Sequence, residues 1–185
     1  MSQEQKMFTQ NGWLVQAEHM PSPHFDKRCD QEKVSLLVIH NISLPAGQFG
    51  QHYISDLFLG KLDTTQHPSF SDLAGVRVSA HCLIQRDGNI IQYVSFHDKA
   101  WHAGISQFNG RERCNDFSIG IELEGTDDIP YTPEQYQQLV NLTRCLQDDF
   151  PAIMSNVVGH CDIAPNRKTD PGQSFNWDYF RQQLS

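Results

Sequence analysis

The chain has 185 residues, of which 38% are hydrophobic and 19% charged, as in an ordinary soluble globular protein. A chain of this length can bury about 70% of its unfolded surface in a single core, and we expect one domain over residues 1–185. Fourteen Lys and Arg against 22 Asp and Glu give a net charge of −8, which argues against nucleic acid or an anionic membrane as a partner.

The cysteines and the N-terminal residues indicate in which cellular compartment the protein is expected. The five cysteines are odd in number, widely spaced and free of any C-x-x-C pair, which favours reduced, mostly buried thiols over a disulfide framework. Residues 1–7 are polar and lack the apolar core of a signal peptide. No stretch approaches the roughly 20 apolar residues of a membrane span. We therefore expect a cytoplasmic protein without an obligate protein partner.

The first half of the chain predicts strands separated by one long excursion. Residues 34–40 read as a buried strand. Residues 45–75 are rich in glycine and predict a long loop that holds one short helix near residues 51–58. Residues 77–94 predict a hairpin that turns at Asp87-Gly88.

The second half predicts a loop region over residues 101–111, then an alternating strand and two helices. The strand covers residues 117–125. Thr132 as N-cap, with Pro133 and Gln135 in a capping box, begins a helix that Pro151 stops. A last helix is expected over residues 177–184. These elements together predict an α/β domain around a mixed central sheet.

Two apolar runs each lead into a histidine, His40 and His160, and Asp170 follows on a Pro-bounded loop. Two imidazoles and one carboxylate form a three-ligand set for zinc that leaves the fourth position to water, as in a catalytic site. Lys168 precedes the carboxylate by two positions and could meet developing negative charge. Cys161 is not expected to join, because neighbours on a strand point to opposite faces. The alternative is that both histidines are structural, since no local spacing such as H-E-x-x-H supports a metal site.

Glu122 is the candidate general base. It lies on the strand face opposite the apolar residues and beside Gly120, whose missing side chain leaves room. Partial desolvation there would raise the pKa of the carboxyl group toward the range useful for taking a proton from water. The alternative is that Glu122 and Glu124 form the solvated face of the strand. A glycosidase pair is disfavoured, because residues two apart on one strand are too close to flank a glycosidic bond.

Five segments carry a family resemblance: VIHNIS at 38–43, RVSAHC at 77–82, AWHAG at 100–104, NDFSIGIELEG at 115–125, and GH…RKTDPG within 159–172. In this order and combination they resemble the AmpD proteins, the cytoplasmic 1,6-anhydro-N-acetylmuramyl-L-alanine amidases of Gram-negative bacteria. The resemblance covers nearly the whole chain. It implies a mixed central sheet flanked by helices, and hydrolysis of the amide between 1,6-anhydro-N-acetylmuramic acid and L-alanine of muropeptides in peptidoglycan recycling.

The resemblance also assigns roles to residues. His40, His160 and Asp170 match the ligands of one zinc ion. Glu122 matches the carboxylate that activates the attacking water, and Lys168 matches the residue that stabilises the tetrahedral intermediate. The positions that match contacts to the anhydro-muropeptide are Asn41, Arg77, Trp101, Arg113 and Ala164.

Alternatives remain open at this point. Arg77 and Arg113 could bind the anionic stem peptide through bidentate carboxylate contacts, or they could form surface ion pairs. Trp101 could be a sugar platform or a core aromatic residue. His81 is expected to be structural or to line the rim of the site, and the other histidines, mostly in loops, are expected to have no metal role. A non-catalytic peptidoglycan-recognition module and a wall-lytic amidase are the competing functions; the first lacks part of the metal set, and the second calls for a signal peptide or a wall-binding appendage.

Overall fold

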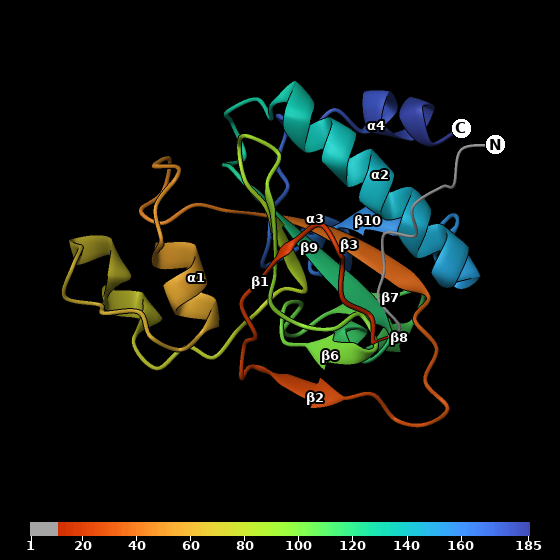
Figure 1. The fold of residues 1–185 in the computed structure, drawn as a ribbon, viewed down its shortest axis with the longest axis horizontal. Helices are drawn as coiled ribbons and strands as arrows, with labels where there is room; N and C mark the ends of the chain where they lie inside the picture. Colours follow the sequence, from red (N-terminus) through yellow and green to blue (C-terminus); the bar gives the residue numbers. More distant parts are fainter. Residues whose placement is uncertain (1–10) are drawn as a thin grey trace.

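The computed structural model describes residues 11–185. Its centre is a six-stranded sheet in the order β1-β5-β4-β9-β3-β10 (Figure 1). Neighbouring strands of this sheet run parallel except β4 and β5, which are antiparallel. The predicted mixed sheet is therefore confirmed. Its strands are β1 (Glu18–His19), β3 (Leu36–Ile42), β4 (Cys82–Ile84), β5 (Ile90–Gln92), β9 (Ser118–Glu124) and β10 (Val157–Gly159).

The two longest strands, β3 and β9, lie in the middle of this sheet and are covered on both faces. Leu37 and Ile39 of β3 pack into the cluster that contains α2, whereas Leu36 and Val38 pack on the other face. A parallel strand buried on both faces reads as a continuous apolar run, as it does here. The strand begins at Leu36 rather than at residue 34 and continues past His40 to Ile42.

Two helices flank one face of the sheet, with α2 (Pro133–Asp149) lying along it and α4 (Trp177–Leu184) beside α2 (Figure 1). The predicted capping box is present: Thr132 Oγ1 accepts from the Gln135 N–H at 3.1 Å, and Gln135 Oε1 accepts from the Thr132 N–H at 3.1 Å. The apolar face of α2 packs against β9 through residues of one core cluster. Its members from α2 and β9 are Tyr136, Leu139, Val140, Leu142, Leu146, Ile119, Ile121 and Leu123.

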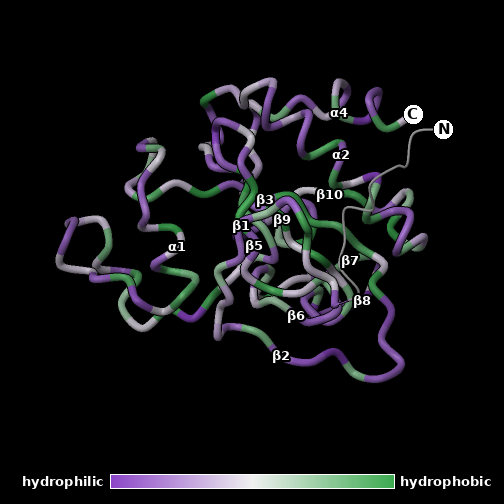
Figure 2. Tube along the Cα trace, viewed as in Figure 1, coloured by the Kyte–Doolittle hydropathy of each residue, from purple (hydrophilic) through white to green (hydrophobic). Residues whose placement is uncertain are grey.

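The long excursion after β3 projects to one side of the sheet (Figure 1). It holds α1 (Tyr53–Phe58), as expected, and a 3-10 helix, Pro68–Leu73, that the sequence did not indicate. Apolar residues of α1 pack against β4 and β5 in a second cluster. Figure 2 shows how hydropathy varies along the chain, with apolar segments at the sheet and hydrophilic segments in the outer loops.

The expectation of a plain loop over residues 101–111 is wrong. Strands β7 (Gln107–Phe108) and β8 (Arg111–Glu112) form a hairpin, which turns at Asn109 and Gly110 with φ of 48° and 80°. Positive φ at both central residues is the geometry that Asn-Gly favours in a two-residue hairpin turn. The other elements are β2 (Phe25–Lys27), which pairs antiparallel with β6 (Asp98–Ala100), α3 (His160–Ile163), and 3-10 turns at Cys114–Asp116 and Pro151–Ile153.

All five cysteines are free thiols, as expected, but they are not mostly buried. Cys82 and Cys114 are buried, Cys29 is exposed, and Cys145 and Cys161 are intermediate. Among residues 11–185, no helix is long and apolar enough to cross a membrane.

Candidate active site

Three elements bring His40, His160 and Asp170 together at the C-terminal side of the sheet. His40 comes from β3, and His160 is the first residue of α3 rather than a strand residue, because β10 ends at Gly159. A Cβ at Gly159 would lie 2.7 Å from the ring of Pro171, so glycine allows the loop that carries Asp170 to approach. The Asp170 carbonyl also accepts from the Cys161 N–H at 3.0 Å, but the Cys161 thiol is not among the converging ligand atoms.

Three ligand atoms converge in a small triangle. His40 Nδ1 lies 3.0 Å from His160 Nδ1, and each of these nitrogens lies 3.2 Å from Asp170 Oδ2. A tetrahedral zinc ion with bonds of ~2.0–2.1 Å requires donor atoms about 3.3 Å apart. The donor types and their spacing therefore fit zinc, and three protein ligands leave one position open. This group could hold a metal ion.

The charges of the triangle are those that a metal site needs. Burial lowers the pKa of His40 to about 4, although the hydrogen bond to Asp170 opposes the shift. Burial alone would raise the pKa of Asp170, but its hydrogen bonds with His160 and His40 outweigh this and hold the pKa below its usual range. At neutral pH the site thus offers a neutral His40 imidazole and an ionised carboxylate, the ligating forms of both groups.

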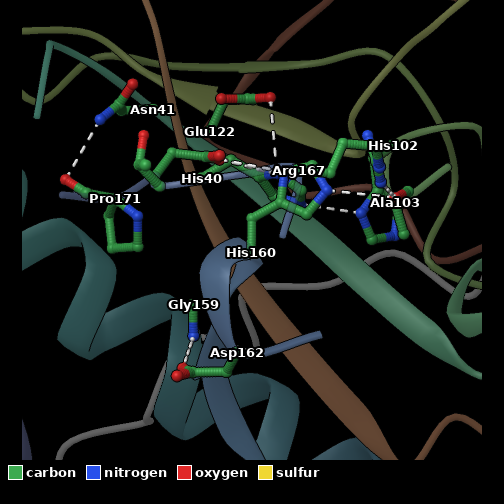
Figure 3. Close-up of polar contacts among 12 residues, drawn as sticks. His40, Asn41, His102, Ala103, Glu122, Gly159, His160, Asp162, Arg167 and Pro171 are labelled. Atoms are coloured by element: carbon green, nitrogen blue, oxygen red, sulfur yellow. Dashed lines mark hydrogen bonds and ion pairs between the residues drawn. The ribbon is translucent and has the colours of Figure 1, made fainter. Parts of the chain in front are cut away.

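The outer nitrogens of both histidines have partners, as Figure 3 shows. His160 Nε2 lies 3.1 Å from the carbonyl oxygen of Ala103, and His40 Nε2 lies 2.9 Å from Nδ1 of His102. The sequence reading gave His102 no part in the site, and it assigned the space at Gly120 to Glu122. In the structure the ring of His102 fills that space, because a Cβ at Gly120 would lie 2.4 Å from it. The sequence Trp101-His102-Ala103-Gly104 was among the segments that carry the family resemblance, but the contact between His102 and His40 is formed only in the folded protein.

Glu122 lies beside the triangle, on the strand next to His40. Its Oε1 is 4.0 Å from His40 Nδ1, and its Oε2 is buried without a hydrogen-bond partner in the described part of the chain. Burial, together with the nearby charge of Asp170, raises the pKa of Glu122 well above its usual value, while Lys168 opposes the shift. The strand face that carries Glu122 is therefore buried rather than solvated: Glu122 is only 9% exposed and Glu124 2%.

Lys168 lines the same cavity as Glu122 and the triangle, a hollow of about 320 Å³. Within residues 11–185 no ion pair holds its ammonium group, and its charge lowers the pKa of both Glu122 and His40. The apolar part of the cavity lining comes from the end of β3, from α1 and from the segment that leads into β4. Its apolar side chains include Ile42, Leu44, Leu57, Phe58, Leu73, Val76 and Val78.

Two of the five expected substrate contacts lie at this cavity. Trp101 lines it and is held by a 2.9 Å hydrogen bond from Nε1 to Asp26 and by stacking on His24, with ring centroids 5.8 Å apart. Asn41 also lines it, and its amide donates to the Pro171 carbonyl at 3.1 Å (Figure 3). The same amide donates to Asp127 at 2.8 Å. Asn41 thus holds the loop that presents Asp170.

The other three contacts lie outside the metal cavity. Arg113 and Ala164 line a separate hollow of about 670 Å³ between the β7–β8 hairpin and the end of α3. Arg113 has a left-handed φ of 62° and an ion pair with Asp116 at 3.2 Å. Arg77 is exposed and lines a hollow of about 160 Å³ that shares Leu57, Leu73 and Val76 with the metal cavity. The structure therefore does not place these three residues beside the triangle.

Comparisons with a family model and with known proteins identify the same family. The model of the N-acetylmuramoyl-L-alanine amidase family matches residues 30–173. The 1,6-anhydro-N-acetylmuramyl-L-alanine amidase AmpD of Escherichia coli K12 is 60% identical over 179 residues, which are 97% of this chain and 98% of that protein.

Solved structures agree with the sequence comparison. A crystal structure of a selenomethionine derivative of AmpD is 59% identical, covers 97% of this chain and 100% of its own, and has a TM-score of 0.94. The amidase AmiD from E. coli, solved with anhydro-N-acetylmuramic acid-L-Ala-D-γ-Glu-L-Lys, is 31% identical over 85% of this chain and 60% of its own, with a TM-score of 0.59. The chain therefore belongs to the AmpD group of the N-acetylmuramoyl-L-alanine amidase family and is an amidase of that class.

Proposed function

We propose that this amidase depends on one zinc ion, held by His40, His160 and Asp170, and that its substrate is the anhydro-muropeptide of peptidoglycan recycling. The bond cleaved is the amide between 1,6-anhydro-N-acetylmuramic acid and L-alanine. The identity to AmpD over nearly the full length of both chains supports this substrate. We further propose that the chain acts in the cytoplasm as one amidase domain, without an obligate protein partner.

The observation that carries the proposal is the juxtaposition of three groups in one cavity. The triangle of His40, His160 and Asp170 lies beside a buried carboxylate, Glu122, and an ammonium group, Lys168, that no ion pair holds in the described chain. Amide hydrolysis needs a nucleophile, a proton carrier and a positive group for the carbonyl oxygen. Each requirement has a candidate within this cavity.

Bound zinc supplies Lewis-acid polarisation and acidifies water toward a pKa of about 7. Glu122 takes the proton of the attacking water and transfers it to the leaving nitrogen of L-alanine. Its raised pKa suits this exchange, because the carboxyl group must both accept and release a proton. Lys168 lies where its positive charge can oppose the negative charge that develops on the carbonyl oxygen.

The proposed substrate contacts divide between the two ends of the muropeptide. Trp101 offers an indole face at the metal cavity for the compact bicyclic sugar, and Asn41 lies at the same strand end. Arg77, Arg113 and Ala164 lie in the two other hollows, and we assign them to the anionic stem peptide. The two guanidinium groups supply positive charge on a protein whose net charge is −8.

The purified protein tests this proposal against three substrates: an anhydro-muropeptide, the same muropeptide with a free reducing end, and intact peptidoglycan. Mass spectrometry of the products should show release of a peptide with N-terminal L-alanine, fastest from the anhydro form. Equal rates on both soluble substrates would contradict the anhydro preference. Binding without cleavage would indicate a recognition module, and solubilisation of intact peptidoglycan would indicate a wall-lytic amidase.

A further inference from the structure

His102 forms a chain of hydrogen bonds with His40 and Ser118. Its Nδ1 lies 2.9 Å from His40 Nε2, and its Nε2 lies 3.0 Å from Ser118 Oγ. The rings of His40 and His102 meet edge to face, with an interplanar angle of 89°. His102 therefore contacts the side of His40 that faces away from the candidate metal position (Figure 3).

The direction of these hydrogen bonds follows from the ligating atom. His40 presents Nδ1 to His160 and Asp170, so its Nδ1 must carry a lone pair to bind a metal ion. The proton of the neutral His40 ring then lies on Nε2 and is donated to His102 Nδ1. A neutral His102 that accepts at Nδ1 carries its own proton on Nε2 and donates it to Ser118 Oγ. Ser118 is fully buried. Its hydroxyl group can donate or accept, so it can accept from His102 Nε2 and end the chain of hydrogen bonds.

The protein holds His102 in this place from several directions. Asn115 Oδ1 accepts from the backbone N–H groups of His102 at 3.2 Å and Ala103 at 2.8 Å. Gly120 leaves the space that the His102 ring occupies. Asn115 thus fixes the backbone that carries the ring, and the space at Gly120 receives the ring itself. A side chain whose position is determined without the metal site is suited to orient a neighbour.

Ala103, the residue after His102, contacts the outer nitrogen of the second candidate ligand, His160. The Ala103 carbonyl lies 3.1 Å from His160 Nε2 and accepts from Arg167 Nη2 at 2.7 Å. A carbonyl oxygen can only accept, so the proton of a neutral His160 lies on Nε2 and its Nδ1 is free to ligate. Two consecutive residues therefore contact the outer nitrogens of both candidate metal ligands.

We propose that His102, backed by Ser118, is a positioning residue that fixes His40 in the tautomer whose Nδ1 can bind the metal ion. This inference rests on the proposed zinc site. Hydrogen-bond partners of metal-ligating histidines fix ring orientation and tautomer, and their loss typically costs about 10–100-fold in metal affinity or activity. His102 acts in this role through the His40 ring and not as a ligand of the metal ion.

Zinc affinity, measured by competition with a chromogenic chelator, tests the inference without reference to catalysis. His102→Phe keeps an aromatic ring but removes the acceptor, and should weaken zinc binding by about 10–100-fold. His102→Asn places an amide oxygen near the position of Nδ1 and should recover most of the affinity. His97→Phe is the matched control, because this exposed histidine meets Phe150 edge to face and lies outside the chain of hydrogen bonds. The zinc affinity of this variant should equal that of the wild type.

Imidazole NMR of the zinc-loaded wild type should also show the His40 proton on Nε2. If His102→Phe fails to fold, Ser118→Ala provides the test, with weaker zinc binding expected in a folded protein. A wild type that binds no zinc would contradict the proposed function itself. A zinc-binding wild type whose folded His102→Phe or Ser118→Ala variant keeps full affinity would overturn the positioning role alone.

Discussion

His40 and Glu122 lie directly opposite each other on the adjacent parallel strands β3 and β9, with Glu122 Oε1 4.0 Å from His40 Nδ1. Both strands are in the middle of the sheet, so backbone hydrogen bonds fix the separation between a candidate metal ligand and the candidate base. Sites on strands are held more precisely than sites on loops. The third ligand, Asp170, comes from a loop, which Asn41 ties to the same strand through the Pro171 carbonyl.

Replacement of Glu122 by Gln should separate proton transfer from metal binding. The amide keeps the shape of the side chain but cannot accept the proton of water, so turnover should fall by about 10²–10⁴-fold. Zinc content and thermal stability should stay near those of the wild type. Glu124→Gln, two residues along the strand, is the control, because the Glu124 carboxylate accepts from the Gly50 and Arg86 N–H groups and does not line the metal cavity. This variant should lose at most the Arg86 contact and keep turnover near that of the wild type. Near-normal turnover by Glu122→Gln would remove Glu122 from the mechanism.

Lys168→Ala should lower kcat by about 10²–10³-fold, the usual cost of losing one group that stabilises an oxyanion. Metal content should be retained, because Lys168 is not one of the three converging ligands. Lys61→Ala, an exposed lysine on the excursion, should have no effect on kcat. Steady-state kinetics with an anhydro-muropeptide measure both variants, and an unchanged kcat for Lys168→Ala would contradict the assignment.

Trp101→Ala tests the sugar platform. Losing an aromatic contact worth about 1.5–3 kcal/mol should reduce kcat/KM for the anhydro-muropeptide by about 10–100-fold. Trp101→Phe keeps an apolar face but loses the hydrogen bond to Asp26, and should retain more activity than the alanine variant. Circular dichroism and zinc content should be unchanged in both variants. A Trp101→Ala protein that unfolds would instead make Trp101 a core residue.

The lowered pKa of His81 leads to a prediction of how the free energy of unfolding depends on pH. It is fully buried, with Nδ1 accepting from the Gly120 N–H at 3.0 Å and Nε2 facing the Asp98 carbonyl at 3.0 Å. Burial, followed by the charge of Arg28, lowers its pKa from 6.5 to about 3. The unfolded chain therefore binds a proton that the folded chain does not as pH falls below about 6.5 toward 3.

This difference in proton binding should cost stability at up to about 1.4 kcal/mol per pH unit within that range. His81→Asn keeps an acceptor for the Gly120 N–H and removes the titration, so its free energy of unfolding should fall less between pH 7 and 5 than that of the wild type. Urea unfolding of both proteins in the presence of a chelator measures the difference. Parallel losses in the two proteins would show that His81 does not titrate as described.

Local signals in the sequence were sufficient for several elements. The helix that begins with the Thr132 capping box and the last helix, Trp177–Leu184, are where the sequence predicted them. The hairpin that turns at Asp87-Gly88 is also confirmed by the antiparallel pairing of β4 and β5. Caps and turns depend on neighbouring residues, and so they can be recognised without the fold.

Features that depend on distant contacts were not predictable in this way. The alternating pattern of β9 allows a solvated polar face, but a middle strand covered on both sides buries it. His102 looked like a loop histidine, because its contacts with His40 and Ser118 come from separate strands. Asn109-Gly110 did carry a local signal for the short hairpin, and it was assigned to a loop instead.

Reconstitution with zinc tests the central claim most directly. The protein is stripped of metal with a chelator, and hydrolysis of an anhydro-muropeptide is then followed as zinc is added in small increments. Activity should be absent at the start, rise linearly, and reach its limit at about one zinc ion per chain, while Asp170→Ala should remain inactive at the same zinc concentrations. Full activity in the metal-free protein would contradict a mechanism that depends on the triangle of His40, His160 and Asp170.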